Sequence, residues 1–493
     1  MLSKSRIIRG VQCHKSLWLH KHQPQLREIS DDLQAVFDTG TQVGLLAQQK
    51  FPGGTDASEG HEWPNFECAD TTKYLLGIGQ KVIYEATFVH NKVLVAVDIL
   101  VKNELGSWDA YEVKSTNSLK SPHIMDCAIQ FHVITSYSLD IRSFSVMHFN
   151  KKYVRQGELD IKQLFTSTDI TEEVLELQEE MPEVIDELEA IQQQKTCPEL
   201  AIGSHCDEPY ECDFKAYCWK HIPEYSVFDL TNPRNRDWEL YEKGILKIKD
   251  IPVDYAMGEK HRIQHLAEIT GKSHIVKDEI DHFLSDLEYP IYYFDFETMM
   301  TAVPMYDNTR TYQQIPFQYS VHKQPSFGAE CEHREFLPQV ESGVKSPDPR
   351  EELISHLVRD LGEKGSIVAY HSSFEQSRIK ELARDFPEYS EPLLALTERI
   401  IDLEIPFRRK WYYTKEMQGR SSIKKVLPAL VPELSYSDLE IQDGGSASTQ
   451  YLAMHQGEYE GDYPNARKNL LDYCELDTFA MVKVLEKLFE VIA

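Results

Sequence analysis

The sequence predicts an α/β protein with two separate α/β domains joined by a helical connector. The first observation is a set of closely spaced strand-like runs, each bounded by turn residues, at residues 81–89, 92–101 and 108–114. The second is a strand-like run that opens a new α/β pattern after residue 288 and ends in a helical segment at 470–492. We therefore expect domains at 1–222 and 288–493, with 223–287 as the connector.

The net charge and the composition limit the classes of function that the protein can have. The 493 residues include 52 Lys and Arg against 80 Asp and Glu, a net charge of −28. This excludes a uniformly basic protein that coats DNA, but allows action on nucleic acid through a local basic groove or through metal ions held by carboxylates. No apolar run reaches the roughly 20 residues of a membrane span, and no secretory signal is evident. Nine sparse cysteines predict a reducing, cytoplasmic setting.

A carboxylate–lysine motif lies on the strands predicted for the first domain. Asp98 interrupts an apolar run, and Glu112 and Lys114 follow two residues apart, hence on one face of the next strand. On neighbouring strands, Asp98 and Glu112 would bind Mg²⁺ or Mn²⁺, with Glu85 as a further carboxylate. Lys114 would orient or deprotonate the attacking water. A surface Glu–Lys pair beside a strand-end Asp is the alternative.

Four cysteines form a second motif. Cys206, Cys212 and Cys218 recur every six residues, and Cys13 lies near the N-terminus. Thiolates so distributed predict a [4Fe–4S] cluster that joins the N-terminus to this later segment. The alternatives are unrelated free thiols, or a zinc site that also uses one of the nearby histidines, His14, His205 or His221.

These two motifs together resemble the iron–sulfur branch of the PD-(D/E)XK nucleases, which includes RecB-like exonucleases and the nucleases that trim DNA for CRISPR spacer acquisition. The resemblance covers about residues 1–220 and implies a restriction-endonuclease-like fold. It also implies that Asp98 and Glu112 bind metal, that Lys114 is catalytic and that the four cysteines ligate the cluster. The sequence departs from the family in its cysteine spacing, and in having Ile134 four residues after Gln130 where a tyrosine is expected.

A second set of carboxylates is spread over the C-terminal half. Asp295 and Glu297 are two residues apart on a strongly strand-like run. Glu375 follows, and Tyr473 and Asp477 are one turn apart on the predicted C-terminal helix. Four carboxylates can hold two divalent ions about 3.5–4 Å apart, which stabilise both the attacking and the leaving oxygen in phosphodiester cleavage. The phenol of Tyr473 is suited to position the attacking water.

Over about residues 288–490, the order and spacing of these carboxylates and the tyrosine resemble those of the DEDDy exonucleases of the RNase H-like (DnaQ-like) superfamily. The resemblance implies an RNase H-like fold and 3′-to-5′ removal of nucleotides. The second motif departs from that family, because His371 and Glu375 stand where it has Asn and Asp. The whole chain is similar to a group of uncharacterised bacterial proteins that pair these two domains.

A basic and aromatic stretch at residues 406–427 supplies the usual ingredients of a single-strand channel. A solvated loop is the alternative. The residues predicted to contact nucleic acid are Arg408, Arg409, Lys410, Trp411, Lys424 and Lys425. No phosphate-binding loop or dinucleotide fingerprint occurs, so ATP-driven unwinding would need a partner such as a helicase.

The sequence thus predicts a cytoplasmic, metal-dependent nuclease with two active sites, which processes DNA ends or single strands in repair, recombination or defence. One alternative is an exoribonuclease, because no feature of the sequence reads a 2′-hydroxyl. The other is a nucleic-acid-binding scaffold whose nuclease sites have degraded.

Overall fold

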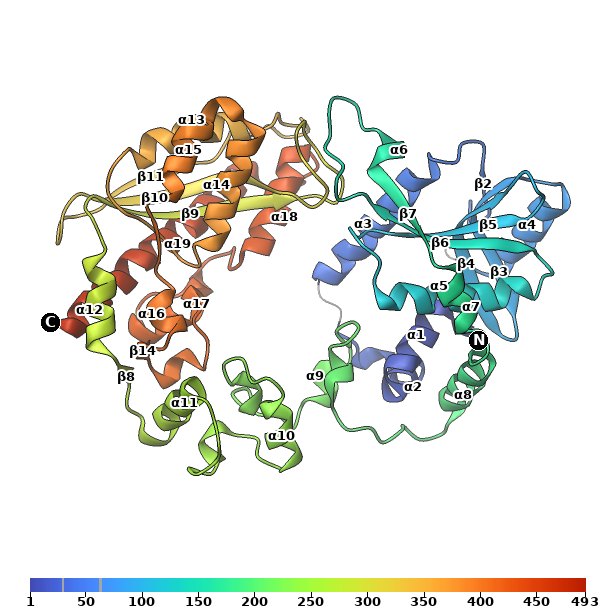
Figure 1. Cartoon of the computed structure of the whole chain (residues 1–493), viewed down its shortest axis with the longest axis horizontal. Helices are drawn as coiled ribbons and strands as arrows, with labels where there is room; N and C mark the ends of the chain where they lie inside the picture. The colour runs from blue at the N-terminus through green and yellow to red at the C-terminus, as the bar shows by residue number, and fades with distance from the viewer. Residues whose placement is uncertain (29–30, 62–63) are drawn as a thin grey trace. The chain divides into compact units, whose positions relative to one another are not determined.

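The computed structural model describes residues 1–28, 31–61 and 64–493. It divides into two compact units (Figure 1). The first unit comprises Met1–His221 with the short segment Ala302–Tyr312, and the second comprises Ile222–Thr301 with Gln313–Ala493. Both contain sheets and helices, so the predicted α/β class is confirmed. None of the described helices carries an apolar stretch long enough to cross a membrane.

Two segments are grouped differently from the predicted domains. The segment 223–287, expected as a separate connector, belongs to the second unit, where its strand β8 (His274–Ile275) pairs with β14 (Tyr412–Tyr413). Ala302–Tyr312 belongs to the first unit, because main-chain hydrogen bonds of 2.9–3.0 Å join Arg155 to its residues 308 and 309.

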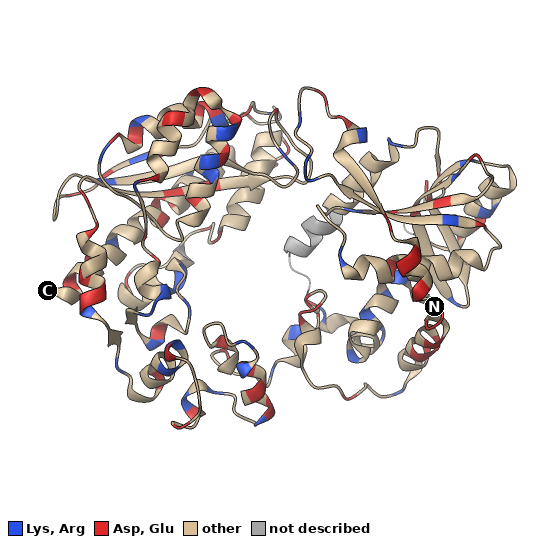
Figure 2. Cartoon of the chain, viewed as in Figure 1, with Lys and Arg blue, Asp and Glu red and all other residues tan. Residues whose placement is uncertain are grey.

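The first unit is built on a sheet with the order β2-β3-β4-β5-β6-β7, and β1 pairs with β4. Its strands are β1 (Leu2–Ser3), β2 (Thr55–Asp56), β3 (Val82–His90), β4 (Val93–Lys102), β5 (Trp108–Lys114), β6 (Ile141–Phe149) and β7 (Phe165–Asp169). Its helices are α1 (Lys4–Gln12), α2 (His14–His22), α3 (Asp31–Gln48), α4 (Phe66–Gly77), α5 (Ser121–Thr135), α6 (Ile161–Leu164), α7 (Thr171–Glu176), α8 (Met181–Gln193) and α9 (Lys215–Cys218). Helix α8 carries several acidic residues (Figure 2), of which Glu183, Asp186 and Glu187 are exposed.

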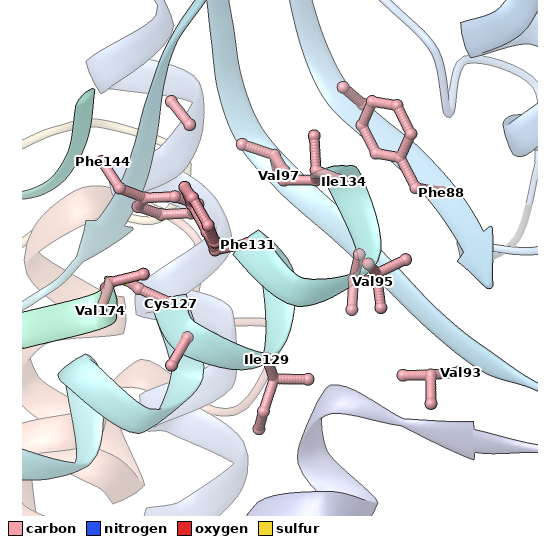
Figure 3. Packing of buried hydrophobic residues seen from close by; sticks show 14 of the residues in the cluster. Phe88, Val93, Val95, Val97, Cys127, Ile129, Phe131, Ile134, Phe144 and Val174 are labelled. Atoms are coloured by element: carbon pink, nitrogen blue, oxygen red, sulfur yellow. The ribbon is translucent and has the colours of Figure 1, made fainter. Parts of the chain in front are cut away.

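Helix α5 packs on this sheet to form the core of the first unit (Figure 3). Val93, Val95 and Val97 of β4 and Ile129 and Phe131 of α5 belong to one buried cluster. Alternation along β4 places these valines on the α5 side. Helix α5 connects β5 to β6, which pair in parallel, so it also lies over the strand that carries the predicted Glu112 and Lys114.

The regular alternation of β3 and β4 breaks where the predicted acidic residues lie. On β3, Ile83 and Ala86 face the same core although they are three positions apart, and Glu85 between them has a left-handed φ of 50°. On β4, Val97 and Leu100 likewise share this core on either side of Asp98. A non-glycine residue with positive φ is uncommon and often marks a functional position.

The second unit is built on a sheet with the order β11-β10-β9-β12-β13. Its strands, besides β8 and β14, are β9 (Ile291–Met300), β10 (Gln314–Gln324), β11 (Glu332–Phe336), β12 (Ile367–Ala369) and β13 (Ile400–Asp402). Its helices are α10 (Arg236–Glu242), α11 (Glu259–Thr270), α12 (Lys277–Ser285), α13 (Arg350–Leu361), α14 (Ser373–Asp385), α15 (Ser390–Thr397), α16 (Ile405–Arg408), α17 (Ile423–Leu430), α18 (Gly444–Gln456) and α19 (Tyr463–Ile492).

Strand β9 separates the core of this unit from its candidate site. Tyr292, Phe294 and Phe296 pack in a buried cluster with residues of α13, α14 and α15. Because neighbouring side chains of a strand point to opposite faces, Asp295 and Glu297 point the other way, toward the face where α19 packs along β9 and β10.

Candidate active sites

The carboxylates predicted for the second unit converge on one cavity of about 480 Å³. Asp295 and Glu297 reach it from β9, and Tyr473 and Asp477 reach it from α19. Glu375 lies in the first turn of α14, which begins just after β12, the parallel neighbour of β9. The structure therefore brings together all five residues predicted for this site.

The cavity holds four acidic side chains but only one basic side chain among the described residues that line it. Glu297, Glu375 and Asp477 are at most 7% exposed. Among the described residues that line the cavity, Lys424 is the one lysine or arginine. Burial, together with the charges of the other three carboxylates, raises the pKa of Asp295 well above its usual range. Burial raises the pKa of Glu375 to about 8 and that of Asp477 to about 6.

Glu375 has an unsatisfied oxygen in this setting. Its Oε2 atom is buried and finds no hydrogen-bond partner within the described part of the chain. A buried carboxylate oxygen without a donor is costly, so it calls for a cation. The donor set of four hard oxygen-bearing groups fits Mg²⁺ or Mn²⁺. His371, the other residue of this motif, does not line the cavity; it is largely exposed, with Nδ1 2.8 Å from Glu404 Oε2.

Two further side chains, which were not predicted from the sequence, lie beside the carboxylates of the cavity. Tyr436 donates a 2.6 Å hydrogen bond to Asp477 Oδ1. The ligand atoms of Asp295, Glu297 and Cys474 lie within 4.8 Å of one another, so a buried thiol adjoins the carboxylates. Burial and the nearby Asp477 raise the pKa of Tyr473 far above its ordinary value, so its phenol remains a hydrogen-bond donor at neutral pH.

The residues predicted to contact nucleic acid lie in different surroundings. Lys424 lines the carboxylate cavity, with Nζ 5.4 Å from the ring centre of Tyr473. Arg408 is paired with Glu404 at 3.1 Å. The remaining placements are exposed Arg409, half-buried Trp411, and Lys425, whose Nζ donates to Gln418 at 2.8 Å.

Lys410 is more buried than a predicted nucleic-acid contact should be. It is 2% exposed, with its Nζ 3.9 Å from the ring centre of Tyr413, and it lines a cavity of about 370 Å³ together with Arg408 and Arg420. Its sequence neighbours are basic, but the chain turns inward at this residue, whose φ is 59°.

We expect Lys410→Met to flatten the pH dependence of stability without weakening nucleic-acid binding. Burial lowers the pKa of Lys410 from 10.5 to about 7 in the folded protein. The stability linked to this group is therefore complete above pH 10.5 and is lost as the pH falls through 7, by at most about 1.4 kcal/mol per pH unit. Denaturant titrations of parent and variant across this range measure it. A variant with the parent's full slope would contradict the assignment.

The acidic strand pair of the first unit also converges. Asp98 Oδ2 accepts a 2.5 Å hydrogen bond from the main-chain N–H of Val113, which places it beside Glu112 on β5. Glu85 adjoins this pair from β3. Burial and the charge of Asp98 raise the pKa of Glu85 to about 9, and burial and Glu112 raise that of Asp98 to about 7. These two carboxylates therefore form an acidic pair that a divalent cation would neutralise.

Lys114 lies at the centre of an ion-pair network. Its Nζ is 2.7 Å from Glu112 Oε1 and 2.5 Å from Asp126 Oδ2. Lys4 Nζ contacts the same Glu112 oxygen at 2.7 Å, and Gln130 donates to Glu112 Oε2 at 2.7 Å. Burial favours the neutral form of Glu112, but the two lysines outweigh it and hold its pKa well below the usual range.

Sequence reasoning missed Lys4 and Asp126 in this network. Asp126 precedes Gln130 by one helical turn on α5, so the D-x₃-Q spacing is a signal that would have found it. Lys4 comes from the first turn of α1 and lies 108 residues from Glu112, with no local signal. Asp56 on β2 is a further neighbour, whose charge contributes to the raised pKa of Glu85.

The four predicted cluster cysteines line one common cavity. They are free thiols, and they come from two separate segments. Asp213 fastens those segments together, because it accepts hydrogen bonds from Arg9 at 2.5 and 2.9 Å and from Arg27 at 2.6 Å. Lys15 and Lys215 also line the cavity, and Lys215 is paired with Asp207 at 2.5 Å.

The alternative of a single zinc site requires closely spaced sulfurs. A single zinc ion with bonds of about 2.3 Å draws its sulfurs to within about 4 Å of one another. Among the residues that the structure describes, the sets of three ligand atoms within 4.8 Å lie elsewhere and include none of these cysteines. His205 lines the cavity, whereas His14 faces Glu187 at 3.8 Å.

Comparisons with known proteins leave the activity open. Residues 292–422, which include Asp295, Glu297 and Glu375, match a family described as a domain of unknown function (DUF2779). The chain is 29% identical over 209 residues to an uncharacterised homologue of MG366 in Mycoplasma pneumoniae, covering 39% of the chain and 31% of that protein. It is 27% identical to the uncharacterised MG366 of Mycoplasma genitalium, with the same shares, and 27% identical to UU173 of Ureaplasma parvum, with shares of 39% and 30%. The chain thus spans about a third of the length of these relatives.

Proposed function

We propose that this chain is a metal-dependent nuclease that hydrolyses phosphodiester bonds of DNA, with one active site in each unit. The observation that carries the proposal is the cavity of the second unit, which is lined by four acidic side chains, among them Glu375 with a buried oxygen that lacks a donor within the described part of the chain. Such a charge excess is unfavourable in an ordinary protein core and is expected where divalent cations bind.

The four cavity carboxylates would hold Mg²⁺ or Mn²⁺, which when bound neutralises charge that develops on the phosphate. The protein's own groups serve the rest of the reaction. Tyr473 keeps its proton, so its hydroxyl can donate to and orient the attacking water. Lys424 supplies a fixed cation for a substrate phosphate.

In the first unit, Glu85, Asp98 and Glu112 would hold the metal ion, and Lys114 would orient water and stabilise charge beside them. Gln130 and Asp126 act as positioning residues, because they contact Glu112 and Lys114 from the buried face of α5. The pairing of two nuclease sites suits processing of DNA ends or single strands in repair, recombination or defence, with a helicase partner for duplex regions.

The proposal is tested with full-length protein purified anaerobically and labelled single-stranded DNA, duplex DNA and RNA of one sequence. We expect shortened DNA products with Mg²⁺ or Mn²⁺ and intact substrate when a chelator is present. Faster loss of RNA than of DNA would support the exoribonuclease alternative. Tight binding without cleavage under every metal condition would support the scaffold alternative instead.

We also propose that Cys13, Cys206, Cys212 and Cys218 ligate a [4Fe–4S] cluster. Support comes from four free thiols around one cavity, from the lysines beside them, and from the finding that these cysteines are not among the described sets of three ligand atoms within 4.8 Å that a single zinc would draw together. The cluster would hold the N-terminal helices to the segment after α8.

Anaerobically purified protein should be brown and absorb near about 400 nm, as thiolate-bound iron–sulfur centres do. Cys212→Ser should lose this absorption and most of the bound iron, because serine supplies no thiolate. Cys331→Ser is the matched control, since Cys331 is another half-buried thiol that belongs to the second unit. Colourless parent protein that contains zinc would contradict the cluster.

A further inference from the structure

Two histidines and a glutamate form a separate cluster in the second unit. His322 on β10 and His333 on β11 are directly opposite each other in the antiparallel ladder. Glu475 lies on α19, and one ligand atom from each of the three residues lies within 4.8 Å of the other two. None of them lines the four-carboxylate cavity, so this cluster is not part of the proposed nuclease site.

Hydrogen bonds occupy one ring nitrogen of each histidine. The Thr478 hydroxyl lies 2.8 Å from His322 Nδ1, 2.7 Å from Ser320 Oγ and 3.1 Å from the main-chain carbonyl of Glu475. Ser320 Oγ is also 2.9 Å from His333 Nε2. His322 Nε2 and His333 Nδ1 are therefore the ring nitrogens that can serve as ligands, each on the neutral tautomer protonated at the other nitrogen.

We propose that His322, His333 and Glu475 bind one transition-metal dication, with Zn²⁺ as the best-suited ion. Two neutral imidazoles and a carboxylate are a common zinc ligand set, and three protein ligands leave one position for water. His333 Nδ1 lies 3.7 Å from Glu475 Oε1, close to the roughly 3.4 Å edge of a tetrahedron with bonds of 2.0–2.1 Å.

The histidine rings are stacked with centroids 4.6 Å apart and planes at 28°, so one ring must rotate to direct its nitrogen at a shared ion, whereas other features of the site are already in place. Thr478 and Ser320 hold the two rings from behind, as the outer hydrogen-bond partners of metal-bound histidines usually do. The His322 side chain is buried, whereas the side chains of His333 and Glu475 are 24% and 49% exposed, which gives an ion access from solvent. The bound ion would fasten α19 to β10 and β11.

The test is zinc titration of the metal-free full-length protein against a chromophoric chelator, with Co²⁺ absorption as a second readout. Relative to the parent, His333→Ala and Glu475→Ala should each lose about one zinc equivalent or bind it at least about 100-fold more weakly. Both residues are partly exposed, so these variants are expected to fold, which circular dichroism would check. The matched control is His282→Ala, an exposed histidine on α12.

Two further measurements distinguish zinc bound at this site from metal bound in the nuclease cavity or by the cysteines. Asp295→Asn alters the nuclease cavity and should leave the zinc equivalent in place, so failure of the nuclease proposal would not remove it. The near-ultraviolet charge-transfer absorption of Co²⁺ on cysteine thiolates should be the same in all variants. If His333→Ala and Glu475→Ala bind as many zinc equivalents as His282→Ala, and as tightly, the proposed site does not exist.

Discussion

Asp477→Asn is expected to abolish cleavage by the second unit while leaving the metal-free protein at least as stable as the parent. The substitution keeps the shape and an oxygen that can accept from Tyr436, but it removes one charge from a cavity that holds four carboxylates. Loss of a metal ligand should reduce the cleavage rate at least about 1000-fold, equivalent to about 4 kcal/mol in the transition state. Stability should not fall, because burial raises the pKa of Asp477 to about 6 and so disfavours its charged form at neutral pH.

The measurement is best made in a Lys114→Met background, which leaves the second unit as the proposed source of cleavage. Asp472→Asn is the matched control, since it lies on the same helix but is paired with Lys468 at its surface. Thermal unfolding in the absence of metal supplies the second readout. An inactive but destabilised Asp477→Asn would indicate a structural role, and a variant as active as Asp472→Asn would exclude Asp477 from the site.

The local parts of the two sites could be predicted from the sequence. Residues 81–89 were expected as a strand and form β3 at Val82–His90, because alternating apolar residues and a following turn are local signals. Asp98 and Glu112 come together because a short connection between β4 and β5 makes them antiparallel neighbours. The spacing of Tyr473 and Asp477 likewise fixes their common face on α19.

The remaining parts depend on tertiary packing, which the sequence does not encode locally. Lys4 reaches Glu112 across 108 residues. Lys410 resembles its exposed basic neighbours in sequence but is buried against Tyr413. His322 and His333 belong to no motif in the sequence, and only the pairing of β10 with β11 brings them together. In each case the burial and the partners of the residue depend on which helix or strand packs against it.

Lys114→Met is expected to abolish cleavage by the first unit, whereas Lys4→Met is expected to retain it. Both ammonium groups contact the same Glu112 oxygen and both pair with Asp126, Lys114 at 2.5 Å and Lys4 at 3.2 Å, but only Lys114 shares the β5 face with Glu112. Loss of a positioned acid–base or charge-stabilising group should lower the cleavage rate about 10²- to 10⁴-fold. Removing Lys4 makes Glu112 a better cation ligand, so half-maximal cleavage should need less Mn²⁺.

The two lysines are compared in an Asp477→Asn background by titrating Mn²⁺ at saturating DNA. Lys102→Met is the matched control, because it removes an exposed lysine at the end of β4, where Nζ lies over the ring of Trp108. The comparison also distinguishes roles within the network. If Lys4→Met is inactive and Lys114→Met cleaves normally, the catalytic lysine comes from α1 and the E-x-K spacing on β5 is coincidental.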